Sequence, residues 1–257
     1  MTLPLVVPGT QTILRAVTLL KAFSDERPEW GLTDIARSVG LNKTTAFRLL
    51  SALESQGLLA RNPRTDQYRL GPETIALGAR ALRSNDLRSA SHTILRELAE
   101  TVSETATLEV LEGANVLILD EFAGPSLVGT SASVGTRWPS HATSTGKVLL
   151  AELATVDRNR VLPRKLPRLT GRTITDRATL TRELVKVRSR GFATAVEELE
   201  PGYVAVGAPI RNHDGRVVAG LSVGGPSARL TAARVVAIIP IVQRAAKEVS
   251  RRLGFAG

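Results

Sequence analysis

Basic, hydroxyl and aromatic side chains are concentrated within nine residues of the chain, between positions 43 and 51. Ala46, Leu49, Leu50 and Leu53 recur at helical spacing, so a helix that buries them turns the remaining positions outward. An outward arginine can fork onto a guanine edge, hydroxyl groups can reach phosphates, and a lysine at a helix N-terminus meets an approaching phosphate. We therefore expect contacts with DNA from six residues, which are Lys43, Thr44, Thr45, Phe47, Arg48 and Ser51.

A helix-turn-helix over residues 32–51 would position these side chains. Gly40 falls where the turn needs a residue that tolerates a positive φ, and Asn42 offers a side-chain oxygen as N-cap of the second helix. Two helices joined in this way present the second one to the major groove. An ordinary helical hairpin with a solvated polar face is the alternative that this segment leaves open.

The residues around this motif favour a winged helix over positions 11–71. Residues 58–70 alternate as a β-hairpin around a polar turn at 62–66. Arg61 and Arg64 fall at the strand end and the turn, where they are expected to meet the DNA backbone or minor groove. A first helix is expected to close the small core through Ile13, Leu14, Val17, Leu20 and Phe23.

Length and composition limit the remaining possibilities. A chain of 257 residues is longer than one winged helix requires, so a second domain is expected. The absence of cysteine, of a basic N-terminal leader and of a long apolar run predicts a cytoplasmic protein without a membrane span. The net charge is +10, and residues 158–190 alone carry 11 Lys and Arg against 2 Asp and Glu. This basic stretch could be a solvated surface, a further DNA contact or an attraction for an anionic small molecule.

The rest of the chain alternates between helical and strand periodicity. After a disordered tail (1–10), we expect a linker helix over 72–90 and an α+β domain over 91–257, with helices packed on an antiparallel sheet. The expected helices are 91–103, 144–153, one that Asp176 caps and Gly191 ends, and 231–253. The expected strands are 107–111, 116–122, 127–131, 204–210 and 217–223.

Three segments give the chain a resemblance to the IclR family of bacterial transcriptional regulators. They are NKTTAFRLLSALESQGLL in the winged helix, WPSHATSTGKVLLAEL at 138–153 and the glycine-rich stretch at 190–231. The resemblance implies a GAF-like effector-binding domain that takes a small organic acid or aromatic metabolite, with no cofactor. It also implies an operator of double-stranded DNA, and dimers joined through the N-terminal domains that often pair into tetramers.

The resemblance further implies where the effector pocket lies. Hydroxyl groups and helix N-terminal amides at Ser144 and Thr145 would bind a carboxylate, with Ser222 opposite. The remaining positions carried over are Tyr203 and Ala205 as a wall, Ala195 and Gly224 beside them, and Leu127, Thr130 and Trp138 as a cover. Some members have Asp, Cys and Ser where this chain has Ala195, Ala205 and Gly224. That difference predicts a roomier, less polar pocket and a larger, partly aromatic ligand, unless Tyr203 and Trp138 are simply core aromatics.

The sequence gives little support for catalysis or metal binding. The segment around Gly146-Lys147 lacks the phosphate-loop frame, because His141 and Val148 stand where Gly and Ser or Thr are required. The three histidines are far apart, and the acidic residues at 197–200 fall in a turn beside Pro201-Gly202. We expect no catalytic residue and no metal site. The alternative to a ligand-responsive regulator is a ligand-independent architectural or partner-recruiting DNA-binding protein whose second domain serves only oligomerisation.

Overall fold

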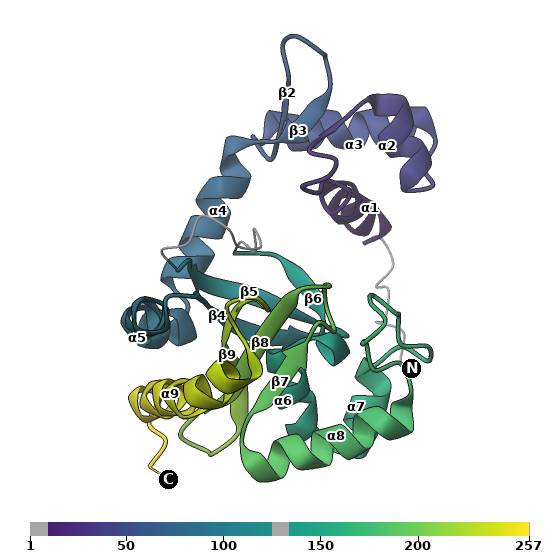
Figure 1. The fold of residues 1–257 in the computed structure, drawn as a ribbon. Coiled ribbons are helices and arrows are strands. Elements are labelled where there is room, and N and C mark those ends of the chain that lie inside the picture. Colours follow the sequence, from purple (N-terminus) through teal and green to yellow (C-terminus); the bar gives the residue numbers. More distant parts are fainter. Residues whose placement is uncertain (1–9, 125–133, 257) are drawn as a thin grey trace. The chain divides into compact units, whose positions relative to one another are not determined.

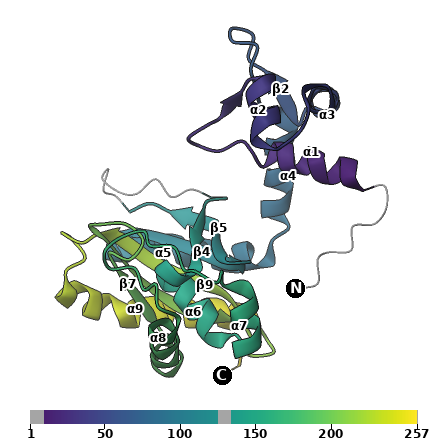
Figure 2. The same ribbon diagram turned by 90° about the vertical axis from the view of Figure 1, so that its right-hand side faces the viewer.

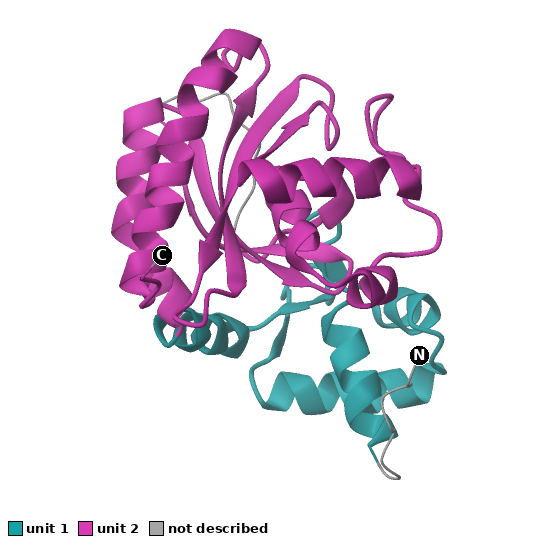
Figure 3. Cartoon of the chain, turned by 90° about the horizontal axis from the view of Figure 1, so that it is seen from below, with its two compact units in different colours: residues 1–84 teal, residues 85–257 magenta. Residues whose placement is uncertain are grey.

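The computed structural model describes residues 10–124 and 134–256. The chain divides into two compact units, residues 1–84 and 85–257 (Figure 3). None of the helices in the described ranges is long and apolar enough to cross a membrane.

The N-terminal unit combines helices with a small antiparallel sheet (Figure 2). Its helices are α1 (Gln11–Leu20), α2 (Leu32–Ser38), α3 (Lys43–Ser55) and α4 (Pro72–Arg83). Its strands are β1 (Glu29–Trp30), β2 (Leu59–Arg61) and β3 (Tyr68–Leu70), in the order β1-β3-β2. Gly40 has a φ of +69° between α2 and α3, and the Asn42 side chain accepts a hydrogen bond from Thr45 N at 2.8 Å. The predicted turn and cap are therefore confirmed.

The core of this unit corrects the prediction for the first helix. Leu19, which was not among the predicted core residues, is fully buried among residues of α2, α3 and the hairpin. Ile13, Leu14 and Val17 are instead exposed, Ile13 by 65%. Leu20 and Phe23, which were also predicted, pack against this core, whereas Ile13, Leu14 and Val17 are not covered by the described residues.

The C-terminal unit is built on a six-stranded antiparallel sheet in the order β6-β5-β4-β9-β8-β7 (Figure 1). The strands are β4 (Thr105–Glu112), β5 (Asn115–Phe122), β6 (Arg137–Pro139), β7 (Ala193–Val196), β8 (Tyr203–Arg211) and β9 (Val217–Pro226). The helices are α5 (Asp86–Val102), α6 (Ser144–Glu152), α7 (Thr155–Val161), α8 (Arg177–Arg190) and α9 (Ala232–Arg252), with a 3₁₀ turn at Ser140–Ala142.

Helices cover both faces of this sheet. α5 and α9 pack against β4, β8 and β9 in the main apolar core, and α6 lies on the opposite face, backed by α8. Side chains at Gly207 and Gly220 would collide with Ser144 and Thr145, so these glycines let the start of α6 approach the sheet closely. The first turn of α6 consequently lies directly over β8 and β9.

The structure differs from the predicted organisation in two details. The expected helix over 72–90 is interrupted at Ser84, and Asn85 caps a new helix by accepting a hydrogen bond from Arg88 N at 3.0 Å. The expected strand at 127–131 lies outside the described residues. The short strands β6 and β7 and helix α7 were not predicted, because three to seven residues carry too little periodicity.

Candidate functional site

The outward face of α3 is the first candidate site. Ala46, Leu49, Leu50 and Leu53 are buried as predicted. Lys43, Thr44, Phe47 and Arg48 are exposed, and Thr45 and Ser51 are partly exposed. Phe47 is 46% exposed, which is unusual for a large apolar side chain outside a binding surface. The six predicted side chains therefore belong to the accessible part of one helix.

The two arginines predicted on the hairpin of β2 and β3, which we call the wing, have different surroundings. The Arg61 guanidinium donates to Asp66 at 2.9 Å and to the Tyr68 hydroxyl at 2.7 Å, and it lies 3.4 Å from Glu54. The hydrogen bond to Asp66 raises the pKa of Arg61. Arg64 is exposed at the tip, where its backbone N–H donates to Asn62. Arg61 thus connects the wing to α3, and Arg64 is the residue available to a partner.

Arg69 was missed by the sequence analysis. It lies on β3, opposite Ala60 of β2 and Glu29 of β1, and is exposed. The strand alternation that buries Tyr68 turns Arg69 to the other side, so the pattern contained the signal.

The second candidate site is a pocket between the sheet of the C-terminal unit and the start of α6. It contains about 430 Å³ of atom-free space, its mouth included. Seven of the ten predicted residues line it: Trp138, Ser144, Thr145, Ala195, Tyr203, Ala205 and Ser222. The other lining residues are Thr107, Glu109, Ile118, Ala142, Thr143 and Leu199. Leu127 and Thr130 lie outside the described residues.

The three predicted hydroxyl groups are not equivalent. Ser144 and Ser222 are buried, and their hydroxyls form no hydrogen bond within the described ranges. The Thr145 hydroxyl instead donates to the Glu109 carboxyl group. Two hydroxyls in the wall of a cavity, with no hydrogen bond to the described residues, are groups that a ligand could engage.

Gly224 does not line the pocket. A side chain at this position would overlap the Tyr203 hydroxyl, so the tyrosine already fills the space that the missing side chain leaves. The prediction that Gly224 enlarges the cavity is therefore wrong. Glycine here makes room for an aromatic wall.

Glu109 is the most unexpected residue in the pocket. It is a buried acid in the middle of β4, and the Thr107 hydroxyl donates to it at 2.7 Å. Burial raises the pKa of Glu109, against the opposing effect of the hydrogen bonds from Thr145 and Thr107. Alternation along the predicted strand places positions 107 and 109 on the same face, so a polar pair facing the interior could have been recognised from the sequence.

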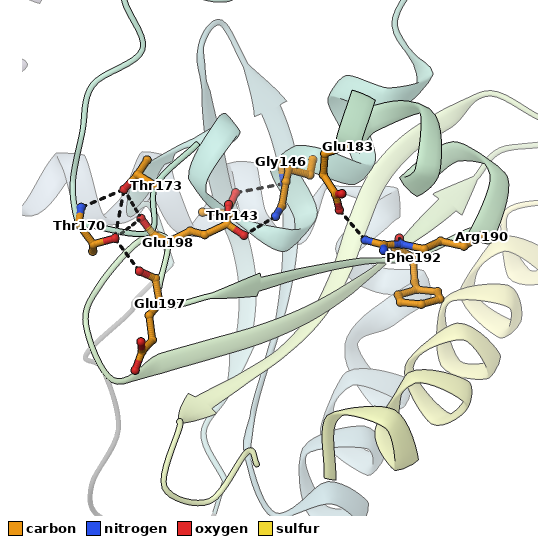
Figure 4. Close-up of polar contacts among 10 residues, drawn as sticks. Thr143, Gly146, Thr170, Thr173, Glu183, Arg190, Phe192, Glu197 and Glu198 are labelled. Carbon is orange, nitrogen blue, oxygen red and sulfur yellow. Dashed lines mark hydrogen bonds and ion pairs between the residues drawn. The ribbon is translucent and has the colours of Figure 1, made fainter. Parts of the chain in front are cut away.

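A buried ion pair anchors the segment 197–202 beside the pocket. Lys147, on α6, is 1% exposed and its Nζ lies 2.6 Å from Glu198 Oε1. Thr170 and Thr173 donate to the backbone carbonyls of Glu197 and Glu198 at 2.6 and 2.7 Å (Figure 4). The sequence predicted a turn for the acidic residues at 197–200. The turn is present, but Glu198 points inward and is buried.

Much of the basic stretch at 158–190 has internal partners. Arg190 pairs with Glu183 at 2.8 Å (Figure 4). Arg177 donates to the Leu162 and Pro163 carbonyls. Buried His141 donates from Nε2 to the Pro167 carbonyl, and burial lowers its pKa. No group of three or more His, Asp or Glu in residues 10–124 and 134–256 is arranged to hold a metal ion.

Two family models together match most of the chain. Residues 12–63 match the IclR helix-turn-helix domain, and residues 79–251 match the bacterial transcriptional regulator IclR C-terminal domain. The chain is 32% identical to the HTH-type transcriptional regulator XynR of Escherichia coli over 250 residues, with 97% of this chain and 99% of that protein covered. It is 36% identical to the regulator BhcR of Paracoccus denitrificans, with 85% and 79% covered.

Solved structures agree with this assignment. An IclR regulator from Alicyclobacillus acidocaldarius superposes with a TM-score of 0.85 at 30% identity, with 95% of this chain and 98% of that chain covered. An IclR homologue from Microbacterium hydrocarbonoxydans, crystallised with 4-hydroxybenzoate, gives 0.82 at 31% identity, with 94% and 98% covered. The winged helix and the pocket-bearing domain define a DNA-binding transcriptional regulator. The chain belongs to the IclR family.

Proposed function

We propose that this regulator binds a pseudo-palindromic operator and that a small organic acid in the C-terminal pocket changes its operator affinity. It acts as a regulator in the cytoplasm, where its DNA lies, and not as an enzyme. The observation that carries the proposal is that Ser144 and Ser222 line a cavity beside the start of a helix, with hydroxyls that form no hydrogen bond to the described residues. A domain kept only for oligomerisation has no need of hydroxyls that face a cavity and are available to a ligand.

The DNA contacts are assigned to the exposed face of α3 and the tip of the wing. Arg48 is the long donor for a base edge, and Lys43 with the Thr44, Thr45 and Ser51 hydroxyls serves phosphates. Phe47 supplies an apolar contact, and Arg64 extends from the wing. Arg61 is left out, because its guanidinium already holds Glu54, Asp66 and Tyr68 together.

The chemistry of the pocket favours an aromatic acid. Trp138, Ile118 and Tyr203 provide flat and apolar surface, and the free hydroxyls provide donors for a carboxylate. The relative that was crystallised with 4-hydroxybenzoate supports this choice.

Oligomerisation is assigned to the uncovered apolar residues of the N-terminal unit. Ile13, Leu14 and Val17 on α1 and Ile75 and Leu77 on α4 are exposed, and α4 buries none of its residues. A single winged helix also reads too few base pairs for a unique genomic address, so at least a dimer is required. Light scattering should show a species of at least twice 27.5 kDa.

Operator binding by Arg48→Ala tests the DNA assignment. The variant should lose about 1–3 kcal/mol on the specific site and little on random DNA, because a bidentate base contact discriminates between sequences. Arg96→Ala, an exposed change on α5, is the matched control and should bind both DNAs normally. Equal losses on both DNAs would reassign Arg48 to the phosphate backbone. If no organic acid in a panel changes operator affinity, the ligand-independent alternative is favoured.

A further inference from the structure

The position of Glu109 within the sheet suggests a role beyond packing. On β4 it lies opposite Ile118 of β5 and Gly220 of β9, and its side chain faces the pocket together with Thr107. The Thr107 and Thr145 hydroxyls each donate to one of its two carboxyl oxygens. Each oxygen has a second lone pair that can accept a further hydrogen bond.

No basic side chain among the described pocket residues balances Glu109. The pocket lining within the described ranges contains no Lys, Arg or His. The nearest buried ammonium, that of Lys147, is bound to Glu198. Glu121 lies on the neighbouring strand β5, where it pairs with Thr107 of β4. Burial, reinforced by the charge of Glu109, raises the pKa of Glu121 to about 7. A second carboxylate placed against an ionised Glu109 would therefore meet a like charge without compensation.

A ligand hydroxyl suits this carboxyl group in either protonation state. It donates to a carboxylate, and it can also accept a hydrogen bond from a neutral carboxylic acid. A ligand carboxylate suits only the neutral acid. A hydroxyl is therefore the ligand group that suits Glu109 in both protonation states.

The part of the pocket beside Ser144 suits a carboxylate. Ser144 approaches Gly207 on β8, and β8 is separated from β4 by the single strand β9. Two strand spacings place the β4 and β8 backbones roughly 10 Å apart. An aromatic ring with substituents at opposite ends can bridge such a distance when each end also makes a hydrogen bond.

We propose that Glu109 is a specificity-determining residue that accepts a hydrogen bond from a hydroxyl group on the effector, so that the pocket takes a hydroxylated aromatic acid with its hydroxyl on β4 and its carboxylate near Ser144. This inference rests on the proposed effector-binding function and specifies the ligand that the site takes. Glu109 thereby distinguishes a hydroxylated ring from the unsubstituted ring.

Titration calorimetry with two matched ligand pairs tests the inference. The probes are 4-hydroxybenzoate against benzoate, and 4-hydroxybenzamide against benzamide, each titrated into the wild-type chain, Glu109→Gln and Glu100→Gln. Wild type should bind the hydroxylated member of each pair about tenfold more tightly, as expected for a hydrogen bond to a charged or strongly polar group. Glu109→Gln preserves the shape of the side chain and partners for both threonines, and should reduce each ratio to about threefold or less. Glu100→Gln, an exposed change on α5, should leave the ratios at the wild-type value.

The remaining outcomes separate the inference from the function it rests on. Equal affinity within both pairs for wild type would overturn the role of Glu109 and leave effector binding in place. An equal loss for all four probes in Glu109→Gln would reduce Glu109 to a residue that shapes the pocket. A selective loss of the two benzoates would show that Glu109 donates to the carboxylate instead. Failure of every probe to bind wild type would refute the proposed effector class and the inference together.

Discussion

Replacement of Lys147 by methionine should strongly destabilise the C-terminal unit. The Lys147 side chain is 1% exposed and that of Glu198 is 11% exposed, and their charged atoms are 2.6 Å apart. Glu198 Oε2 is already buried without a partner among the described residues, so loss of the ammonium leaves a buried carboxyl group with little compensation. Breaking such a pair from one side costs roughly 3–5 kcal/mol. Methionine retains most of the lysine stem, so little of this loss comes from a cavity.

The loss should depend on pH in a defined direction. Burial raises the pKa of Glu198, and Lys147 opposes that rise. Without Lys147 the pKa rises further, and a carboxyl whose folded-state pKa lies above its unfolded value costs stability as pH rises through the folded pKa. The variant should therefore be most destabilised at pH 8 and should recover towards pH 5.

Urea unfolding followed by tryptophan fluorescence measures this effect. In a Trp30→Phe background the remaining tryptophan, Trp138, lies in the C-terminal unit, so its signal reports on that unit. Arg251→Met, which breaks the exposed pair with Glu248, is the matched control and should cost less than about 1 kcal/mol. Further replacement of Glu198 by leucine in Lys147→Met should restore at least half of the lost stability. A loss for Lys147→Met as small as that of the control would refute the reasoning.

Four further outcomes are expected. Arg64→Ala should weaken binding to all DNA sequences alike and reduce the magnitude of the salt slope by about one, and an effect confined to the operator would contradict a phosphate contact. Gly224→Ser should displace the Tyr203 ring and weaken effector binding in calorimetry, whereas unchanged affinity would mean that the ring is not part of the wall. Ile75→Asp should lower the mass in light scattering, because Ile75 is 75% exposed on the uncovered face of α4, and an unchanged mass would move the interface elsewhere. Glu121→Gln should stabilise the protein at pH 8 more than at pH 5 in thermal unfolding, since burial raises the pKa of Glu121 to about 7; a pH-independent difference would show that this carboxyl is solvated.

Local patterns made the helix-turn-helix predictable. The buried positions of α3, the Asn42 cap and the Gly40 turn are each determined by residues within a few positions of one another. The wing hairpin was predictable for the same reason. Contacts across long sequence separations were not. Periodicity showed that α1 has an apolar face but not that Leu19, rather than Ile13, faces the core.

The pocket also combines residues that local motifs predicted with contacts that only the folded chain shows. Motif positions identified Ser144, Ser222 and Tyr203 as lining residues, but the meeting of Glu109 with Thr145 depends on how α6 lies over the sheet. The relation between Gly224 and Tyr203 likewise requires the register of β8 and β9, which pairs residue 224 with residue 205. Sequence reasoning therefore found the walls of the pocket and missed the polar group at its floor.

Operator affinity as a function of effector concentration, measured by fluorescence anisotropy for wild type and Ser222→Ala, tests the central claim most directly. Saturating 4-hydroxybenzoate should change the operator affinity of wild type. Ser222→Ala, which removes one unpartnered pocket hydroxyl, should bind ligand-free operator normally and lose most of that response, because a hydrogen bond to a charged group contributes on the order of 1 kcal/mol or more. A response of Ser222→Ala equal to that of wild type would contradict the account and place the effector elsewhere.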